Sequence, residues 1–418
     1  VEAVFHKWGL NAVVIGQVTD DGLVRVKHHG VVVAEVSAKS LADDCPTYHL
    51  EADEPAYISE ASARSLDSIR VSDYSSALLE LLARPTIASK RWVWEQYDHM
   101  VQTNTAVFPG SDAAVLRIRG SQKGIAVTSD CNSRFVYLDP FVGAKMTVYE
   151  AARNLACSGA RPLAVTDCLN FANPEKPEGF WQFREAVRGL AEACEELNTP
   201  VISGNVSFYN ETPETAIYPT PTIGMLGLLQ DVDNRVTSEF KAEGDVIVLL
   251  SVGWPSDVSA GLAGSELQLT QSLEPYGSLP QFDEAKHAAL TELLLSLTDR
   301  KLLKSAHDVS EGGLGVALAE CAIRSGQGAE VSLRSPLRSE ASLFGELPGY
   351  VVITAESGST SAILDSAAQR GLSSDVIGRV GGEALEIELN GAKLLSVLVA
   401  QADSAYEDAL PGIMESHS

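Results

Sequence analysis

The chain has 418 residues, of which 45% are hydrophobic, and its formal net charge at pH 7 is −25. This length and composition predict two or three domains with ordinary buried cores. The acidic charge argues against nucleic acids and anionic membrane surfaces as partners, although a divalent metal can still neutralise a phosphate ligand locally.

Six cysteines are scattered along the chain without a CxxC pair, and the eight histidines show no metal-ligand spacing. We interpret the cysteines as reduced thiols of a cytoplasmic protein. No apolar run reaches the roughly 18 residues of a membrane span, and no signal peptide is recognisable.

The front of the chain starts at Val1 inside an apolar pattern, so we expect the sequence to be part of a longer protein. Residues 12–36 predict three strands, AVVIGQV, LVRV and VVVAEV, separated by tight turns at DDG and HHG. Residues 51–75 are rich in Ser, Ala and Glu with little periodicity, which predicts a linker or a surface excursion.

A second block covers about residues 90–230. AAVLRI (113–118) and KGIAVTSD (123–130) predict a hairpin, and a helix is expected near 146–158. LAVTD (163–167) reads as a short apolar strand. From 177 to 198 the apolar residues recur every three or four positions, which predicts an amphipathic helix with Pro177 in its first turn.

The stretch VISGNVSFYNET (201–212) then begins as a buried-looking strand and ends in small and polar residues. Residues 163–205 therefore read as strand, helix, strand. If the strands are parallel, Asp167 and Gly204–Asn205 lie at the same carboxyl-terminal edge of a sheet, where ligands of α/β units commonly bind.

The residue types at this edge suit a nucleotide site. Asp167 offers a carboxylate for a nucleotide or its metal, and Gly204 lets the backbone approach a phosphate closely. Asn205 offers a hard oxygen ligand for Mg²⁺, and the hydroxyl of Ser207 can donate to a substrate oxygen. Taken one at a time, both stretches could also be plain turns.

A third block, residues 231–418, predicts a separate α/β layer. Strands are expected at GDVIVLLS (244–251), GYVVITAE (349–356) and ALEIEL (384–389), and helices near 284–299 and 314–325.

Two further segments have both a structural and a functional interpretation. HDVSEGGLGVALAE (307–320) is a Gly-rich turn opening a helix, which either binds phosphate or only caps the helix, and it lacks the P-loop lysine. TSDCNSRFVYLDP (128–140) either lines a site or turns the chain. No nucleophile–base pair is apparent anywhere.

Four long motifs carry a family resemblance that extends over essentially the whole chain. They are RWVWEQYDHMVQTNTAVFPGSDAAVLRI, LDPFVGAKMTVYEAARNLACSGARPLAVTDCLNFANPEKPE, VISGNVSFYNET and HDVSEGGLGVALAE. The chain resembles the second half of the small-type phosphoribosylformylglycinamidine synthase family, within the aminoimidazole-ribonucleotide-synthetase-like superfamily.

The resemblance implies an internally duplicated α+β and α/β fold. Each half has an A domain of mixed sheet plus helices, followed by a B domain of α/β type. We therefore expect a remnant of a preceding B domain at 1–50, a linker at 51–89, an A domain at 90–230 and a B domain at 231–418.

The resemblance also implies an ATP-dependent conversion of an amide to an amidine in purine biosynthesis, with Mg²⁺ as metal. ATP phosphorylates the formamide oxygen of formylglycinamide ribonucleotide, and ammonia displaces the phosphate. A glutaminase subunit and a small bridging subunit would deliver the ammonia.

Carried over residue by residue, the family motifs make Asp167 and Gly204 ATP contacts, Asn205 a Mg²⁺ ligand and Ser207 a substrate contact. No catalytic residue is assigned, and neither His99 nor His307 is expected to act in catalysis, because the family's catalytic histidines lie in the other half. We expect the isolated chain to be inactive; the alternative is a non-catalytic module that binds nucleotide and docks subunits.

Overall fold

The computed structural model describes residues 1–415 and divides the chain into two compact units, Val1–Leu50 and a second that starts at Glu51. Within the described residues, no helix is both long and apolar enough to cross a membrane. All six cysteines are free thiols, and Cys157, Cys194 and Cys321 are buried.

The first unit consists of α1 (Glu2–Lys7), an antiparallel hairpin of β1 (Leu23–His28) and β2 (Val31–Ser37), and a short 3-10 turn. The HHG turn is confirmed: His29 and Gly30 have φ angles of 49° and 82°, as a tight hairpin turn requires. The prediction of a strand at AVVIGQV is wrong, because residues 12–18 form no strand. No neighbouring strand takes up their backbone hydrogen bonds.

The second unit contains a six-stranded sheet in the order β3-β4-β5-β8-β6-β7. The hairpin expected from the sequence is confirmed as the antiparallel pair β4–β5, and β6 pairs with β7 in parallel, as expected. The strands are β3 (Thr105–Val107), β4 (Ala114–Arg117), β5 (Gly124–Asp130), β6 (Arg161–Asn170), β7 (Val201–Ser207) and β8 (Thr220–Leu229).

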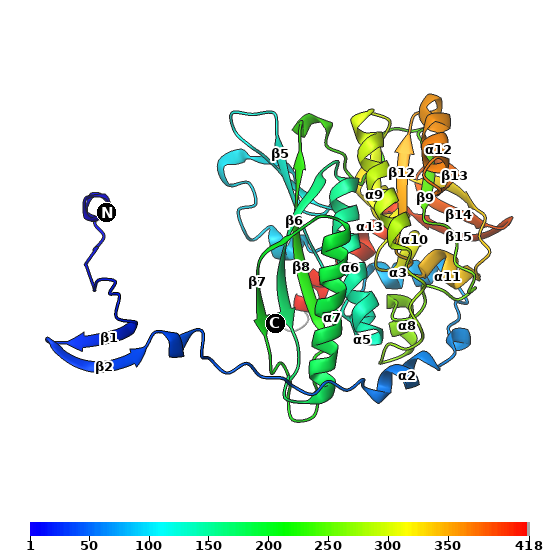
Figure 1. Cartoon of the computed structure of the whole chain (residues 1–418). Helices are drawn as coiled ribbons and strands as arrows, with labels where there is room; N and C mark the ends of the chain where they lie inside the picture. The colour runs from blue at the N-terminus through cyan, green and yellow to red at the C-terminus, as the bar shows by residue number, and fades with distance from the viewer. Residues whose placement is uncertain (416–418) are drawn as a thin grey trace. The chain divides into compact units, whose positions relative to one another are not determined.

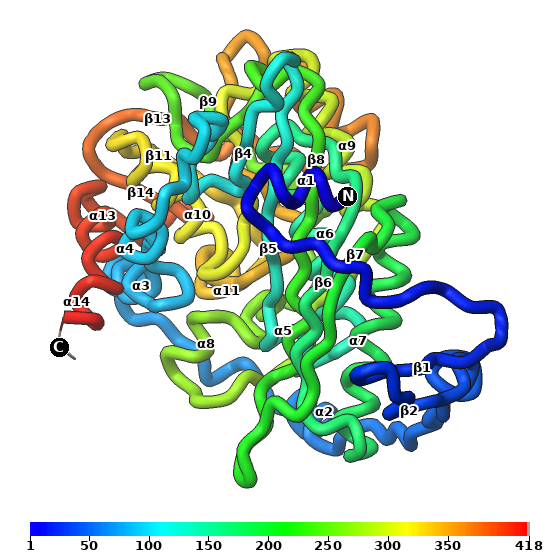
Figure 2. The backbone as a smooth tube through the Cα atoms, turned by 90° about the vertical axis from the view of Figure 1, so that its left-hand side faces the viewer, coloured from blue at the N-terminus to red at the C-terminus, as the bar shows by residue number. Residues whose placement is uncertain are grey.

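Two long helices, α6 (Pro140–Cys157) and α7 (Pro177–Glu196), lie against this sheet and confirm the two helices expected there (Figure 1). Both begin with a proline, whose missing N–H costs nothing in the first turn. Buried side chains of these helices share a core with Ala126, Val165 and Met225 of the sheet. Among the described residues of the second unit, no such helix covers the opposite face, and Figure 2 shows β5, β8 and β6 running side by side there.

Strand β7 differs from the sequence-based expectation. Its apolar residues read as buried, but Val201 is 48% exposed and Ile202 is 70% exposed. The reason is that β7 is the edge strand of the sheet, so only β6 lies beside it.

A second sheet of seven strands has the order β10-β12-β9-β13-β11-β14-β15 and confirms the expected α/β layer. It is antiparallel except for the pair β11–β14. The strands are β9 (Val246–Ser251), β10 (Ser305–Asp308), β11 (Ala329–Leu333), β12 (Tyr350–Ala355), β13 (Ser373–Val380), β14 (Ala384–Leu389) and β15 (Ala392–Leu398).

Helices pack on both faces of this sheet. Along β12, Val351 and Ile353 join a core with α9 (Glu284–Asp299), whereas Val352 joins a core with α10 (Gly313–Ser325). The expected helices near 284–299 and 314–325 are thereby confirmed. The remaining helices are α8 (Glu266–Gln271), α11 (Ser339–Phe344), α12 (Thr360–Ala368), α13 (Val399–Glu407) and α14 (Ala409–Glu415).

Part of the segment expected as a linker belongs to the folded core. It contains α2 (Ala56–Ser62) and α3 (Tyr74–Leu82), followed by the short α4 (Arg91–Trp94). Three leucines of α3 have no exposed surface and pack into the core with α10 and α13: Leu78, Leu81 and Leu82. The sequence concealed this role because the apolar face spans only nine residues, too short to show a clear period.

Candidate functional site

The parallel pairing of β6 with β7 brings the four predicted site residues together. In the ladder, Asp167 lies beside Gly204, Cys168 beside Asn205 and Asn170 beside Ser207. All four predicted residues fall in the last five positions of their strands, which places them near the carboxyl ends, as expected.

The absence of a side chain at Gly204 shapes the contact with Asp167. A Cβ atom at Gly204 would lie 2.0 Å from Oδ1 of Asp167, so only glycine leaves room for this carboxylate. Asp167 also accepts a hydrogen bond from the backbone N–H of Asn205. Partial burial raises the pKa of Asp167, and the hydrogen bond from Asn205 opposes that rise.

The pleat of the strands separates the four residues into two pairs. Asp167 lies opposite buried Ile223 of β8, and therefore on the face covered by helices. Asn205 and Ser207 alternate to the open face. A ligand that touches both pairs must therefore wrap around the exposed edge strand β7.

The open face carries small uncharged hydrogen-bonding groups near the carboxyl ends of β6 and β7. The hydroxyl groups of Thr166 and Ser203 lie 2.7 Å apart. Ser207 donates to Oδ1 of Asn210 over 3.3 Å, whereas the side-chain amide of Asn205 has no hydrogen-bond partner within residues 1–415. Asn205 is thus available to a ligand.

Further along the same open face, the polar groups give way to an apolar patch. We define the open apolar patch by the residues that occupy the outward positions of β4, β5 and β8: Leu116, Ile125, Val127, Leu226 and Leu228. Leu116, Val127 and Leu226 are 39%, 41% and 36% exposed. An apolar sheet face of this kind is characteristic of a surface that another domain covers.

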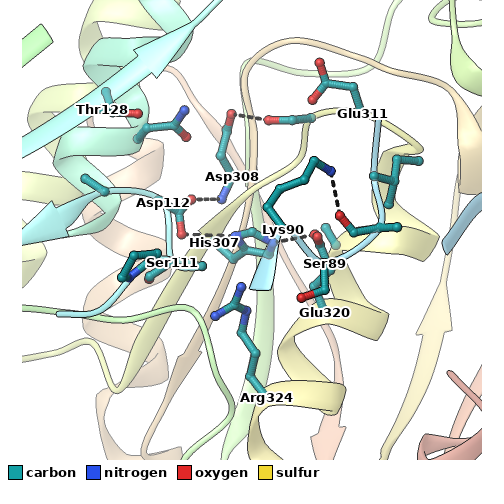
Figure 3. A pocket seen from close by; sticks show the side chains of 18 of the residues that line it. Ser89, Lys90, Ser111, Asp112, Thr128, His307, Asp308, Glu311, Glu320 and Arg324 are labelled. Atoms are coloured by element: carbon teal, nitrogen blue, oxygen red, sulfur yellow. Dashed lines mark hydrogen bonds and ion pairs between the residues drawn. The ribbon is translucent and has the colours of Figure 1, made fainter. Parts of the chain in front are cut away.

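A cavity of about 770 Å³, called here the acidic cavity, lies between segments of both sheets (Figure 3). It is bounded by residues 86–91, the loop before β4, the end of β5, and parts of α6, β10, α10 and α13. Its cationic groups include Lys90 and Arg324. Its carboxylates are Asp112, Asp130, Glu150, Asp308, Glu311, Glu320, Asp403 and Glu407.

His307 is clamped between two of these carboxylates. Its Nδ1 lies 3.0 Å from Oδ2 of Asp112, and its Nε2 lies 2.9 Å from Oε2 of Glu320. Burial alone would lower the pKa of His307, but the two carboxylates outweigh it and raise the pKa well above the ordinary value. Asp112 also accepts the backbone N–H of Asp308 over 2.7 Å, so it ties the loop before β4 to β10.

Two partly buried acids that line the acidic cavity hold protons unusually well. Burial, together with the nearby carboxylates of Glu311 and Asp308, raises the pKa of Glu150 to about 8. The pKa of Asp130 is also raised, first by burial and then by Glu150. No group of three or more His, Cys, Asp or Glu residues within 1–415 is arranged to hold a metal ion by itself.

The Gly-rich turn does open a helix, as expected, but an internal carboxyl group already accepts hydrogen bonds at its N-terminus. Gly312 caps α10 with a φ of 78°, and its N–H donates to Oε1 of Glu346 over 2.9 Å. The same oxygen accepts the N–H of Glu266. This favours the structural interpretation of the turn over phosphate binding at the cap.

The polar segment after β5 serves mainly to anchor α5 (Ser133–Leu138), although Asp130 at its start lines the acidic cavity. Arg134 of this helix lies 2.6 Å from Oε1 of Glu266 and donates to the carbonyl of Gly264.

Sequence reasoning missed the residues that give the acidic cavity its character. Asp112, Glu150 and Arg324 come from a loop and two helices far apart in the chain. The available signal was the spacing of Glu320 and Arg324, four residues apart on one helix beside the histidine of HDVSEGG.

Family models match both sheets of the second unit. The model described as AIR synthase related protein, N-terminal domain, matches residues 110–229, and the corresponding C-terminal domain matches 242–390. The chain belongs to the AIR synthase related family. This confirms the family resemblance and the fold class.

Curated relatives match along nearly the whole chain. The phosphoribosylformylglycinamidine synthase subunit PurL of Moorella thermoacetica is 46% identical over 415 residues, which is 99% of this chain and 56% of the relative. PurL of Chlorobaculum tepidum is 46% identical over 426 residues, covering 97% of this chain and 54% of the relative. The chain thus spans about half the length of the curated relatives it matches.

Solved structures share the fold at low sequence identity. Thermotoga maritima PurL complexed with FGAR has a TM-score of 0.63 at 22% identity, covering 79% of this chain and 54% of that protein. The same protein complexed with ADP has a TM-score of 0.60 at 19% identity, with coverages of 79% and 52%. The functional roles of Asp167, Gly204, Asn205 and Ser207 stay predictions.

Proposed function

We propose that this chain is the carboxy-terminal part of a PurL-type synthase and forms one wall of an ATP-dependent, amidine-forming active site. The observation that carries the proposal is the β6–β7 ladder: the four predicted contact residues lie near the carboxyl ends of these two neighbouring strands, with Asp167 directly beside Gly204. The 46% identity to PurL subunits supports the same reaction class.

The proposed roles follow the chemistry of each group. Asp167 and the backbone at Gly204 bind ATP, which supplies the phosphoryl group that activates the formamide oxygen before ammonia displaces the phosphate. Ser207 positions formylglycinamide ribonucleotide on the open face. The unpartnered amide of Asn205 suits one oxygen ligand of Mg²⁺, and the remaining ligands have to come from outside this strand pair.

The open face indicates why this wall needs a partner. A site on an uncovered sheet does not exclude water, and the open apolar patch beside it favours contact with another protein surface. The part of PurL relatives that this chain does not span is the proposed cover. A glutaminase and a small bridging subunit are proposed as further partners, in keeping with the PurLQS structure from T. maritima.

The test is a turnover assay with ATP, Mg²⁺, formylglycinamide ribonucleotide and ammonia. We expect no amidine from the chain alone, and turnover when it is joined to the remaining part of the Moorella relative. Amidine formation by the chain alone above a no-enzyme control would contradict the one-wall proposal, and an inactive but folded chimera would contradict the proposed reaction.

Single substitutions in the joined enzyme test the roles. Asn205→Ala should lower kcat/KM for Mg·ATP at least about tenfold, and Asp167→Ala should act mainly on ATP. Gln369→Ala, an exposed amide beyond α12, is the matched control and should behave as wild type. Unchanged kinetics in both site variants would show that the strand edge is structural only.

A second candidate function is a non-catalytic nucleotide-binding and subunit-docking module. The acidic cavity favours it, because about 770 Å³ accommodates a nucleotide and its carboxylates could hold one through divalent metal. Titration calorimetry of the chain alone with Mg·ADP tests this candidate. Two results together would favour the module over the synthase. The chain alone would bind Mg·ADP with an affinity that Glu311→Gln lowers, and the joined enzyme would form no amidine.

A further inference from the structure

A second cavity, of about 580 Å³, has the opposite charge character and is called here the basic cavity. It lies between the β3–β4 region and the segment that connects β8 to β9. Its lining contains four cationic side chains and two carboxylates: Arg235, Lys241, Lys304 and Arg324, with Asp233 and Glu239. The whole chain has 31 Lys and Arg against 56 Asp and Glu. Cations therefore outnumber carboxylates in this lining, whereas acidic residues outnumber basic ones in the protein as a whole.

Arg324 is the most buried of the four cations, and the carboxylates of Glu320 and Asp112 balance its charge only at a distance, without a direct ion pair. Its buried Nε has no hydrogen-bond partner, and the guanidinium forms no ion pair within residues 1–415, although it hydrogen-bonds the phenol of Tyr406. A Cβ atom on Gly110 would lie 2.5 Å from one terminal nitrogen of Arg324, so the guanidinium packs directly against this glycine. A desolvated cation without a direct ion pair gains from a well-placed anion.

Lys304 and Arg235 are paired with acids that reach into solvent, whereas Lys241 pairs with Glu239, which is 33% exposed and lines the basic cavity itself. Lys304 lies 2.7 Å from Oε1 of Glu356, whose side chain is 68% exposed. Arg235 lies 3.5 Å from Oδ1 of Asp233, which is 74% exposed. The pairs of Lys304 and Arg235 are exposed and contribute little, so a better-placed anion can replace their partners.

Arg324 lines both cavities, but its neighbours decide the side on which an anion binds. Towards the acidic cavity it meets Asp112 and Glu320, which repel an anion (Figure 3). On the other side, the basic cavity has Arg235, Lys241 and Lys304 against only two carboxylates, Asp233 and Glu239. The positive potential therefore lies on the side of the connecting segment.

We propose that the basic cavity binds a phosphate group, held by Arg324, Lys304 and Lys241. Planar guanidinium and ammonium donors together are typical of phosphate recognition. The cavity is larger than inorganic phosphate needs, and the half-exposed ring of Phe108 with Pro109 offers an apolar wall for the rest of a phosphate ester. This site is separate from the β6–β7 strand edge and does not depend on the proposed synthase function.

The test measures anion binding to the full chain by titration calorimetry and thermal melting at constant ionic strength. The probes are inorganic phosphate and ribose 5-phosphate, with chloride as the reference. EDTA is present throughout, so that no divalent metal can recruit phosphate to the acidic cavity. We expect saturable binding of at least one probe and a rise in Tm; tighter binding of the ester identifies an esterified ligand, and equal affinities identify free phosphate.

Charge-neutralising variants locate the site. Lys304→Gln and Lys241→Gln should each weaken binding about tenfold. Lys393→Gln is the matched control, because Lys393 is also an exposed lysine paired with one glutamate, Glu386, at 2.9 Å. Lys90→Gln, which changes only the acidic cavity, should bind phosphate as wild type does.

Three results would overturn the proposal: no phosphate-dependent heat or Tm rise beyond chloride, an equal loss in Lys393→Gln, or loss of binding in Lys90→Gln. Circular dichroism melts of each variant without ligand identify any that fail to fold. In that case Lys304→Arg, which keeps the charge, should bind and Lys304→Glu should not.

Discussion

The two sheets of the second unit differ in how they are covered. In the seven-stranded sheet, every residue of β9 and β12 is buried, because helices pack on both faces. In the six-stranded sheet, only one face has helices, and six of the seven residues of β7 are exposed. Both sheets are built from apolar strands, so the difference comes from their neighbours and not from strand composition.

This difference separates the parts of the molecule that hold the fold from the parts that are available to ligands. Side chains on the covered sheet gain free energy by burial and tolerate little change. Side chains on the open face and along the edge strand β7 contribute less to stability, and the predicted metal and substrate contacts, Asn205 and Ser207, lie there together with Gly204. Substitutions should therefore affect stability at the first region and activity at the second.

The largest change in the free energy of unfolding is expected from breaking a buried ion pair that joins α6 to β10. Arg153 of α6 binds Asp308 of β10 through two hydrogen bonds of 2.6 and 2.9 Å, and both side chains are 1% exposed. Arg153→Ala leaves a buried carboxylate unpaired and should cost about 3–5 kcal/mol of unfolding free energy in urea titrations.

The matched control is an exposed pair. Arg161 and Glu292 lie 2.6 Å apart with both side chains 56% exposed, so Arg161→Ala should cost less than about 1 kcal/mol. Equal costs for Arg153→Ala and Arg161→Ala would show that coverage does not govern the strength of ion pairs in this protein.

The His307 clamp predicts a pH dependence of stability. Because the folded pKa of His307 lies well above the unfolded value of about 6.5, the folded state binds the proton more tightly. The contribution of His307 protonation to the free energy of unfolding is complete below about pH 6.5. It declines by up to about 1.4 kcal/mol per pH unit as the pH rises towards the folded pKa.

Urea titrations from pH 6 to 9 measure this slope. His307→Gln should be less stable than wild type at pH 6, and the gap should narrow as pH rises. A constant gap across this range would mean that the imidazole does not hold its proton in the clamp.

At the open edge, Gly204→Ala should separate activity from stability. The new Cβ displaces the carboxylate of Asp167, which is partly exposed and free to rotate away. We expect kcat/KM for ATP in the joined enzyme to fall about tenfold, equivalent to about 1.4 kcal/mol, while Tm changes by less than about 3 °C.

Gly358→Ala is the control for Gly204→Ala, because no atom lies within 4 Å of its added Cβ and its φ is ordinary. A loss of stability in Gly204→Ala without a loss of activity would show that this strand edge supports the fold and does not bind the nucleotide.

The smallest effect is expected from deleting residues 1–50. These residues form a compact unit of their own, and none of their side chains is buried. Thermal melting of residues 51–418 should differ from the full chain by less than about 2 °C, corresponding to under about 1 kcal/mol. Unfolding of the shortened chain, seen as loss of the cooperative transition, would show that the first unit is part of the core.

The sequence by itself determined the local elements with a strong period. The helices α7 and α9 and the strand β14 lie where periodicity predicted them, because a long amphipathic pattern leaves few alternatives. The neighbouring positions of Asp167 and Gly204 were also predictable, since parallel strands joined by one helix end at the same edge. The family motifs established the fold class.

Only the tertiary structure decided which of these surfaces are covered. Val201 and Ile202 read as buried but are exposed, whereas α3 read as linker and is buried, because burial depends on segments distant in the chain. The cavities could not be predicted from the sequence for the same reason. Asp112, His307 and Arg324 come from separate elements, and their charges interact only after folding has brought them together. Short-range pattern fixes secondary structure, but solvent exposure and electrostatic environment are properties of the assembled chain.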